Sequence, residues 1–109
     1  MDCAVIACSR ALTLPYPRIW QKLTRLDGPG ANIAKRGVKR STTQEYLRRH
    51  GWTEIRVPAD LRLRSGVFTS ALIFLDGHAH YVGPDGEYPD ELEGKIVLAA
   101  WRERPRWTY

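Results

Sequence analysis

The chain has 109 residues, 43% of them hydrophobic, and a formal net charge of +5, so we expect one domain over residues 1–109 with one modest core. Its two cysteines, Cys3 and Cys8, are too close along one helix to bridge, which excludes a disulfide framework and favours a reducing, cytoplasmic location. No apolar run approaches about eighteen residues, and Asp2 and Arg10 interrupt the N-terminus, so we expect neither a membrane span nor a signal peptide.

The first fourteen residues predict a helix that is buried nearly all round, because Arg10 is the only charge behind Asp2. Asp2 is a favoured N-cap type, which places Cys3 in the first helical turn. There the helix dipole and the unpaired N–H groups favour the thiolate, the reactive form of cysteine. Most cysteines in apolar helices only pack, and we assign Cys8 to the core.

Two more helices are expected before the sheet. An apolar stripe of Ile19, Trp20, Leu23 and Leu26 predicts a helix over residues 17–26. Residues 31–40 show no period and predict a cationic loop. Residues 41–50 predict a third helix, with a capping box formed by Ser41 and Gln44 or by Thr42 and Glu45, and with Gly51 as its stop.

From residue 53 the apolar period changes to two, which predicts strands. The expected strands are a short one at residues 55–57, an alternating segment at 61–64, a central strand at 67–75, and two more at 78–82 and 96–101. The tail, residues 102–109, is expected to be extended. Helices followed by antiparallel strands predict an α+β fold, with three N-terminal helices packed on a C-terminal antiparallel sheet.

The sequence offers Cys3 a partner base far downstream, in Gly77-His78-Ala79-His80. An imidazole can take up and return a proton near neutral pH, which a thiol nucleophile requires. His78 and His80 are two apart on one predicted strand, so they share a face, and either can point at Cys3. Two strand histidines without a role are the structural alternative.

Several short motifs resemble papain-like cysteine peptidases, and are most similar to small phage-encoded peptidase-like domains and to the bacteriocin-processing peptidase domains of ABC exporters. The motifs are Asp2-Cys3-Ala4-Val5-Ile6-Ala7, Leu14-Pro15-Tyr16 with Ile19-Trp20, Tyr46-Leu47 before Gly51-Trp52, and Gly77-His78-Ala79 followed by Asp85-Gly86 and Asp90. The resemblance implies a papain-like fold and a thiol hydrolase, of peptidase, isopeptidase or amidase type, that acts on a protein or peptide. It also implies Cys3 as nucleophile, His78 or His80 as base, and Asp90, with Asp85 as its rival, as the acid that orients the imidazole.

The chain departs from this family at the oxyanion hole. Papain-like enzymes carry a Gln a few residues before the cysteine, whereas only Met1 and Asp2 precede Cys3 here. Losing one such donor costs about a hundred- to a thousandfold in rate. The backbone N–H of Cys3 remains available, and Gln21 or Gln44 is a possible substitute.

Two other classes of function remain open. A phage-type accessory protein that binds a protein of the phage's host needs no chemistry. The aromatic residues Trp101, Trp107 and Tyr109 suit a protein-binding surface. Nucleic-acid binding is less favoured: residues 1–65 hold 13 of the 17 basic residues, but the helix with Arg48 and Arg49 lacks a second basic helix beside it. Cys3, Cys8, His78 and His80 make a poorly spaced zinc set, so we expect no metal or other cofactor.

Overall fold

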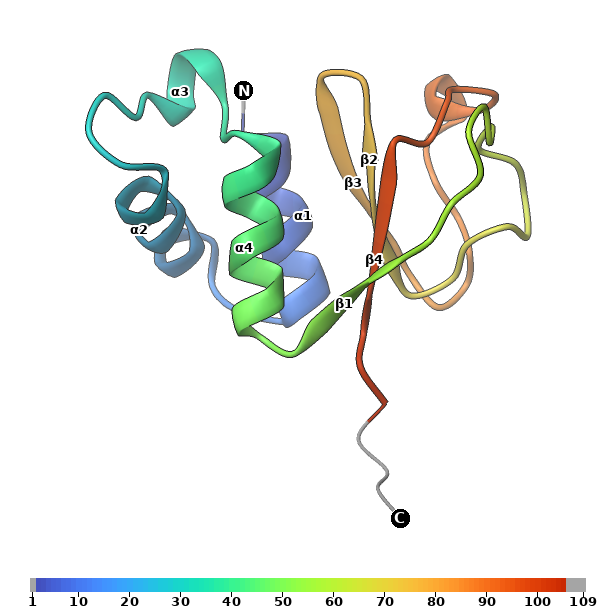
Figure 1. The fold of residues 1–109 in the computed structure, drawn as a ribbon, viewed down its shortest axis with the longest axis horizontal. Helices are drawn as coiled ribbons and strands as arrows, with labels where there is room; N and C mark the ends of the chain where they lie inside the picture. Colours follow the sequence, from blue (N-terminus) through green and yellow to red (C-terminus); the bar gives the residue numbers. More distant parts are fainter. Residues whose placement is uncertain (1, 106–109) are drawn as a thin grey trace.

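The computed structural model describes residues 2–105 and confirms an α+β architecture. Helices gather on one side of a four-stranded antiparallel sheet, and long loops cover the other side (Figure 1). The helices are α1 (Cys3–Leu12), α2 (Tyr16–Asp27), the short α3 (Ile33–Arg36) and α4 (Arg40–Arg49). The strands are β1 (Trp52–Ile55), β2 (Ala71–Leu75), β3 (His78–Val82) and β4 (Ala99–Glu103), with a 3-10 turn, η1 (Asp90–Leu92), before β4. Within residues 2–105, no helix has the length and apolar character needed to cross a bilayer.

Helix α1 packs against the sheet and against α2, and only one of its faces is fully buried. Ala4, Val5, Ala7 and Cys8 are buried, whereas Ile6 is 39% exposed and Leu12 is half-buried. The prediction of burial nearly all round was therefore wrong. Helix α1 contacts β2 but packs mainly on β3. This packing matters for the site because β3 begins with His78.

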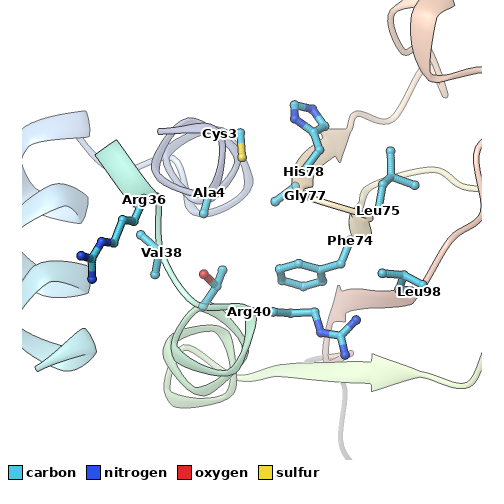
Figure 2. A pocket seen from close by; sticks show the side chains of 13 residues that line it. Cys3, Ala4, Arg36, Val38, Arg40, Phe74, Leu75, Gly77, His78 and Leu98 are labelled. Atoms are coloured by element: carbon cyan, nitrogen blue, oxygen red, sulfur yellow. The ribbon is translucent and has the colours of Figure 1, made fainter. Parts of the chain in front are cut away.

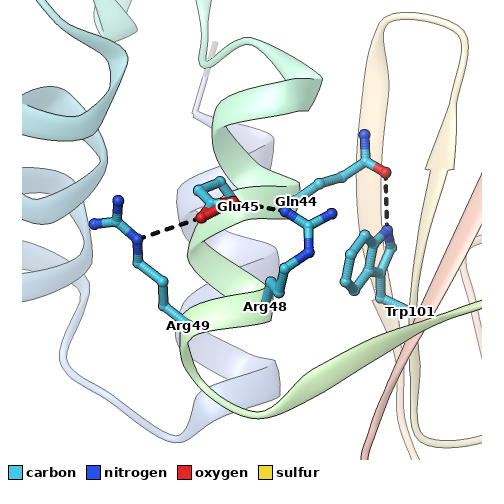
Figure 3. Close-up of polar contacts among 5 residues, drawn as sticks. All are labelled: Gln44, Glu45, Arg48, Arg49 and Trp101. Atoms are coloured by element: carbon cyan, nitrogen blue, oxygen red, sulfur yellow. Dashed lines mark hydrogen bonds and ion pairs between the residues drawn. The ribbon is translucent and has the colours of Figure 1, made fainter.

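Helix α4 starts as expected from its sequence position, but neither predicted capping box forms. Its N-cap is Lys39, which makes no side-chain cap bond. Thr42 instead donates to Asp27 of α2 at 2.7 Å, and Glu45 pairs with Arg48 and Arg49 (Figure 3). Thr42 thus bonds to another helix and Glu45 pairs along its own helix, so neither side chain caps the start of α4. The inward positions of Tyr46 and Leu47 are confirmed.

The segment 31–40, expected to be a loop, contains helix α3. Asn32 caps it by accepting from the backbone N–H of Lys35, and Ile33 anchors it in the core. A four-residue helix is too short to leave a periodic pattern in the sequence, so only the anchor and cap could have indicated it.

The strand order is β1-β4-β2-β3, which makes β2 an interior strand and β3 an edge strand. All five residues of β2 are buried, as expected for a central strand. Its predicted start at residue 67 was too early, because Ser70 adopts a left-handed conformation with φ of 50° that ends the loop just before Ala71. The bounds of β3 match the prediction, whereas β1 and β4 each begin three residues away from their predicted starts.

Both faces of the sheet are buried, and alternate residues face two different clusters. Toward the helices lie Leu72, Phe74, Ala79, Ala99 and Trp101. Toward the loops lie Ala71, Ile73, Leu75, Val82 and Ala100, which pack with Leu63, Phe68, Leu92 and Val97.

Trp101 is a core residue and not part of an exposed aromatic tail, so that prediction was wrong. Its side chain is 1% exposed, and its Nε1–H donates to Oε1 of Gln44 at 3.0 Å (Figure 3). The guanidinium of Arg48 lies over the ring, 5.4 Å from its centroid. The buried indole N–H therefore has the partner it needs. Trp107 and Tyr109 lie outside the described residues.

Candidate active site

The two thiols lie in different environments on α1. Cys3 opens the helix and is half-buried, whereas Cys8 is fully buried in the core between the helices and the sheet. Burial raises the pKa of the Cys8 thiol to about 12, so this thiol stays protonated at neutral pH. Cys3 is the thiol that a substrate can approach.

Packing of α1 on β3 brings Cys3 close to His78, although 75 positions separate them in the sequence. The N-terminal end of α1 and the β2–β3 turn lie at the same end of the molecule (Figure 1). Gly77, with φ of 67°, makes that turn and places His78 as the first residue of β3. Both side chains line a cavity of about 290 Å³ and a smaller one of about 80 Å³ beside it. Figure 2 shows the sulfur and the imidazole on facing sides of the larger cavity.

His80, the second histidine of β3, lies next to His78. The rings of His78 and His80 stack with centroids 6.2 Å apart and planes 17° apart, as residues two apart on a strand allow. His80 lines only the smaller cavity, next to Arg10, whereas His78 lines both. Burial, followed by the neighbouring His78 and Arg10, lowers the pKa of His80, so its imidazole is neutral at neutral pH. His78 therefore shares both cavities with Cys3, whereas His80 shares only the smaller one.

The larger cavity has apolar walls and two cations at its rim. Val38, Phe74, Leu75, Ala79 and Leu98 form most of the walls. Arg40, at the start of α4, extends beneath Phe74 toward Leu98, and the guanidinium of Arg36 points away from Cys3 (Figure 2). These lining residues were not recognised from the sequence, because they come from α3, the α3–α4 loop, α4, β2, β3 and the loop before β4, and no local pattern links them.

Asp2 does not cap α1 as predicted, because its carboxylate makes no cap bond and instead accepts from the Tyr16 hydroxyl at 2.5 Å. This hydrogen bond is the main reason that the pKa of Asp2 lies below its ordinary value. The bond fixes the start of α2 to the residue next to Cys3. The first turn of α1 contains no acidic residue, and Asp2 makes no side-chain cap bond to its N–H groups.

Neither candidate acid lines a cavity together with His78. β3 is an edge strand paired only with the apolar β2, so Leu75 lies opposite His78 and Ile73 opposite His80. Asp90 lies in η1 and is not among the lining residues of either cavity. Asp85 lies beyond the far end of β3, where its carboxylate accepts from the backbone N–H of Glu87. An orienting role for Asp90 stays a prediction that this packing does not support.

The candidate substitutes for the missing oxyanion donor also lie elsewhere. Gln44 is held by Trp101, and neither Gln44 nor Gln21 lines the cavity. Cys3 opens α1, so the backbone N–H groups of the first helical turn are the candidate oxyanion donors. Within residues 2–105, no group of three or more His, Cys, Asp or Glu side chains is arranged to hold a metal ion.

Comparison of the chain with models of known protein families, with curated proteins and with solved structures gives no match. The functional reading therefore rests on the site itself.

Proposed function

We propose that this protein is a small thiol hydrolase of papain-like type that cleaves a peptide, isopeptide or other amide bond, with Cys3 as nucleophile and His78 as general base. The observation that carries the proposal is the meeting of Cys3 and His78 at one apolar cavity. Cys3 opens a helix and His78 opens the strand on which that helix packs, which is the arrangement that papain-like enzymes use.

The residues present can perform both halves of such a reaction. His78 takes the proton of the Cys3 thiol, the thiolate attacks the acyl carbon, and the imidazolium returns the proton to the leaving amine. Water then hydrolyses the thioester, with His78 again accepting a proton, and the free thiol is regenerated. The apolar walls around Phe74 and Leu98 suit an uncharged side chain of the acyl group.

The site has features of a slow enzyme. No carboxylate lies opposite His78 on the neighbouring strand, and no Gln side chain lines the cavity. Each such group typically contributes at least about a hundredfold to the rate of enzymes that have it. We therefore expect turnover well below that of a complete papain-like site.

The experiment is hydrolysis of a fluorogenic peptide and isopeptide library by the full chain, with Cys3→Ala and His78→Gln as variants. Cys8→Ala is the matched control, because it removes the other thiol from the same helix. The proposal expects hydrolysis that is lost with Cys3→Ala, strongly reduced with His78→Gln and retained with Cys8→Ala. Hydrolysis that persists in Cys3→Ala would refute it.

The same missing groups favour a second candidate, a peptidase-like fold that binds a host protein and performs no chemistry. In that case Cys3→Ser leaves the biological effect unchanged. Charge reversal at Lys35, Arg36, Lys39 and Arg40 then abolishes it. These four cations surround α3 and the start of α4 and are all exposed.

A further inference from the structure

A second concave surface lies on the opposite side of the helical layer from the sheet, between α2 and α4. We define the α2–α4 groove by the residues that line it: Arg18, Lys22, Arg25, Leu26, Tyr46, Arg49 and His50. It encloses about 400 Å³, more than the cavity at Cys3, and it shares no lining residue with that cavity. Its lining contains four cations and no carboxylate.

The groove exists because α2 packs against α4. From the sequence, the basic end of α4 lacked a second basic helix beside it. The structure supplies one: Arg18, Lys22 and Arg25 follow the i, i+4, i+7 spacing and form one exposed row on α2. The row faces the end of α4 that carries Arg49 and His50.

The charges of this row are free to bind an external anion. Within residues 2–105, no carboxylate forms an ion pair with Arg18, Lys22 or Arg25. Asp27, the only acid on α2, accepts from Thr42 and from the backbone N–H of Lys39 instead. Arg49 differs, because Glu45 lies 3.5 Å from its Nε.

The spacing of the row suits a line of phosphates more than a single anion. Seven residues of α-helix separate Arg18 from Arg25, which is about 10 Å along the axis. A nucleic-acid strand carries one phosphate per about 3.4 Å of duplex axis, and its phosphates lie further apart when the strand is extended. A row of this length therefore spans two or three successive phosphates.

The imidazole ring of His50 also lines the α2–α4 groove. His50 is exposed and packs edge-on against Tyr46, with ring centroids 4.6 Å apart and planes at 62°. Burial and the nearby Arg18 lower the pKa of His50, so at neutral pH it is an uncharged ring. Unpaired bases stack on such rings with little sequence preference. A concave surface also fits around one strand, whereas reading a duplex groove requires a protruding element.

We propose that the α2–α4 groove binds single-stranded nucleic acid, with Arg18, Lys22 and Arg25 contacting successive phosphates and His50 stacking on a base. The interaction is independent of sequence and weakens steeply with salt. It involves no residue of the candidate active site, so it holds whether or not Cys3 is a nucleophile.

The test is fluorescence anisotropy of a labelled 20-nucleotide single strand, and of its duplex, titrated with the full chain at several salt concentrations. Arg18→Gln/Lys22→Gln/Arg25→Gln should weaken single-strand binding at least about tenfold and reduce the slope of log K against log salt by about two. The matched control is Arg56→Gln/Arg64→Gln/Lys95→Gln, which removes three exposed charges outside the groove and should change affinity less than about threefold. Lys22→Glu alone, at one exposed position, should weaken binding in the same direction.

Four results would overturn the proposal. One is the absence of binding at low salt. The second is an equal loss in the groove variant and in the control, which would mean that net charge alone attracts the strand. The third is equal affinity for the duplex. The fourth is competition by polyglutamate as strong as by unlabelled oligonucleotide, which would make the groove a site for an acidic protein.

Discussion

The α1–β3 contact and the α2–α4 groove both use helices of the same layer but differ in their main chemical groups. The first places a thiol and two imidazoles beside an apolar cavity. The second has no thiol or carboxylate and is lined mainly by cations. The basic residues of the first half of the sequence therefore need not all serve the candidate catalytic residues, because Arg18, Lys22 and Arg25 line the α2–α4 groove and not the cavity at Cys3.

The largest expected effect comes from measuring a variant of each site in the assays for both sites. Cys3→Ala should reduce hydrolysis by at least about a thousandfold and leave oligonucleotide affinity unchanged. The triple glutamine variant of the α2 row should do the reverse. Both variants are to be measured in both assays on the same protein preparations. Loss of both properties in either variant, with the fold intact by circular dichroism, would show that the two regions form one site.

A smaller effect is expected on the free energy of unfolding when an apolar residue of α2 or of α1 is truncated. Leu23 is fully buried between α2 and the rest of the helical cluster, so Leu23→Ala should lower the free energy of unfolding by about 3 kcal/mol. Ile6→Ala is the matched control on α1. Because Ile6 is 39% exposed, its loss should cost about 1 kcal/mol or less. Urea titration measures both, and equal costs would contradict the packing described for α1.

The smallest effect concerns the bond that ties the two regions together, from Tyr16 of α2 to Asp2 beside Cys3. The bond lowers the pKa of Asp2 in the folded state, so its stabilisation is present above the ordinary value of 3.8 and is lost as the pH falls through and below that value. Tyr16→Phe should therefore lower the urea midpoint at about pH 6 and have little effect near pH 2. A difference that is the same at both pH values would rule out this linkage.

The sequence predicted elements well where turn signals bracket them. Asp76-Gly77 and Gly83-Pro84-Asp85-Gly86 flank residues 78–82, and β3 has those bounds. Prediction failed where a side chain finds a distant partner. Thr42 bonds to Asp27 and Gln44 to Trp101, so neither takes part in a cap, and Trp101 is drawn into the core.

The residues of the candidate site could be predicted from the sequence better than their surroundings in the fold. The helix start at Cys3 and the strand start at His78 are local features, and the structure places both at one cavity. The surroundings of His78 depend on strand order, which the sequence does not encode locally. Because β3 is at the edge and pairs only with the apolar β2, no acid lies opposite it on the neighbouring strand, and Asp90, in η1, lines neither cavity with His78.

Activation of Cys3 by His78 can be measured through the pH dependence of iodoacetamide alkylation at Cys3, followed by peptide mass mapping. We expect Cys3 to be labelled in preference to Cys8. We also expect the alkylation rate to rise well below the free thiol pKa of about 8.5. This rise should be lost in His78→Gln and retained in His80→Gln. A single inflection near 8.5 in all three proteins, or preferential labelling of Cys8, would show that His78 does not activate Cys3.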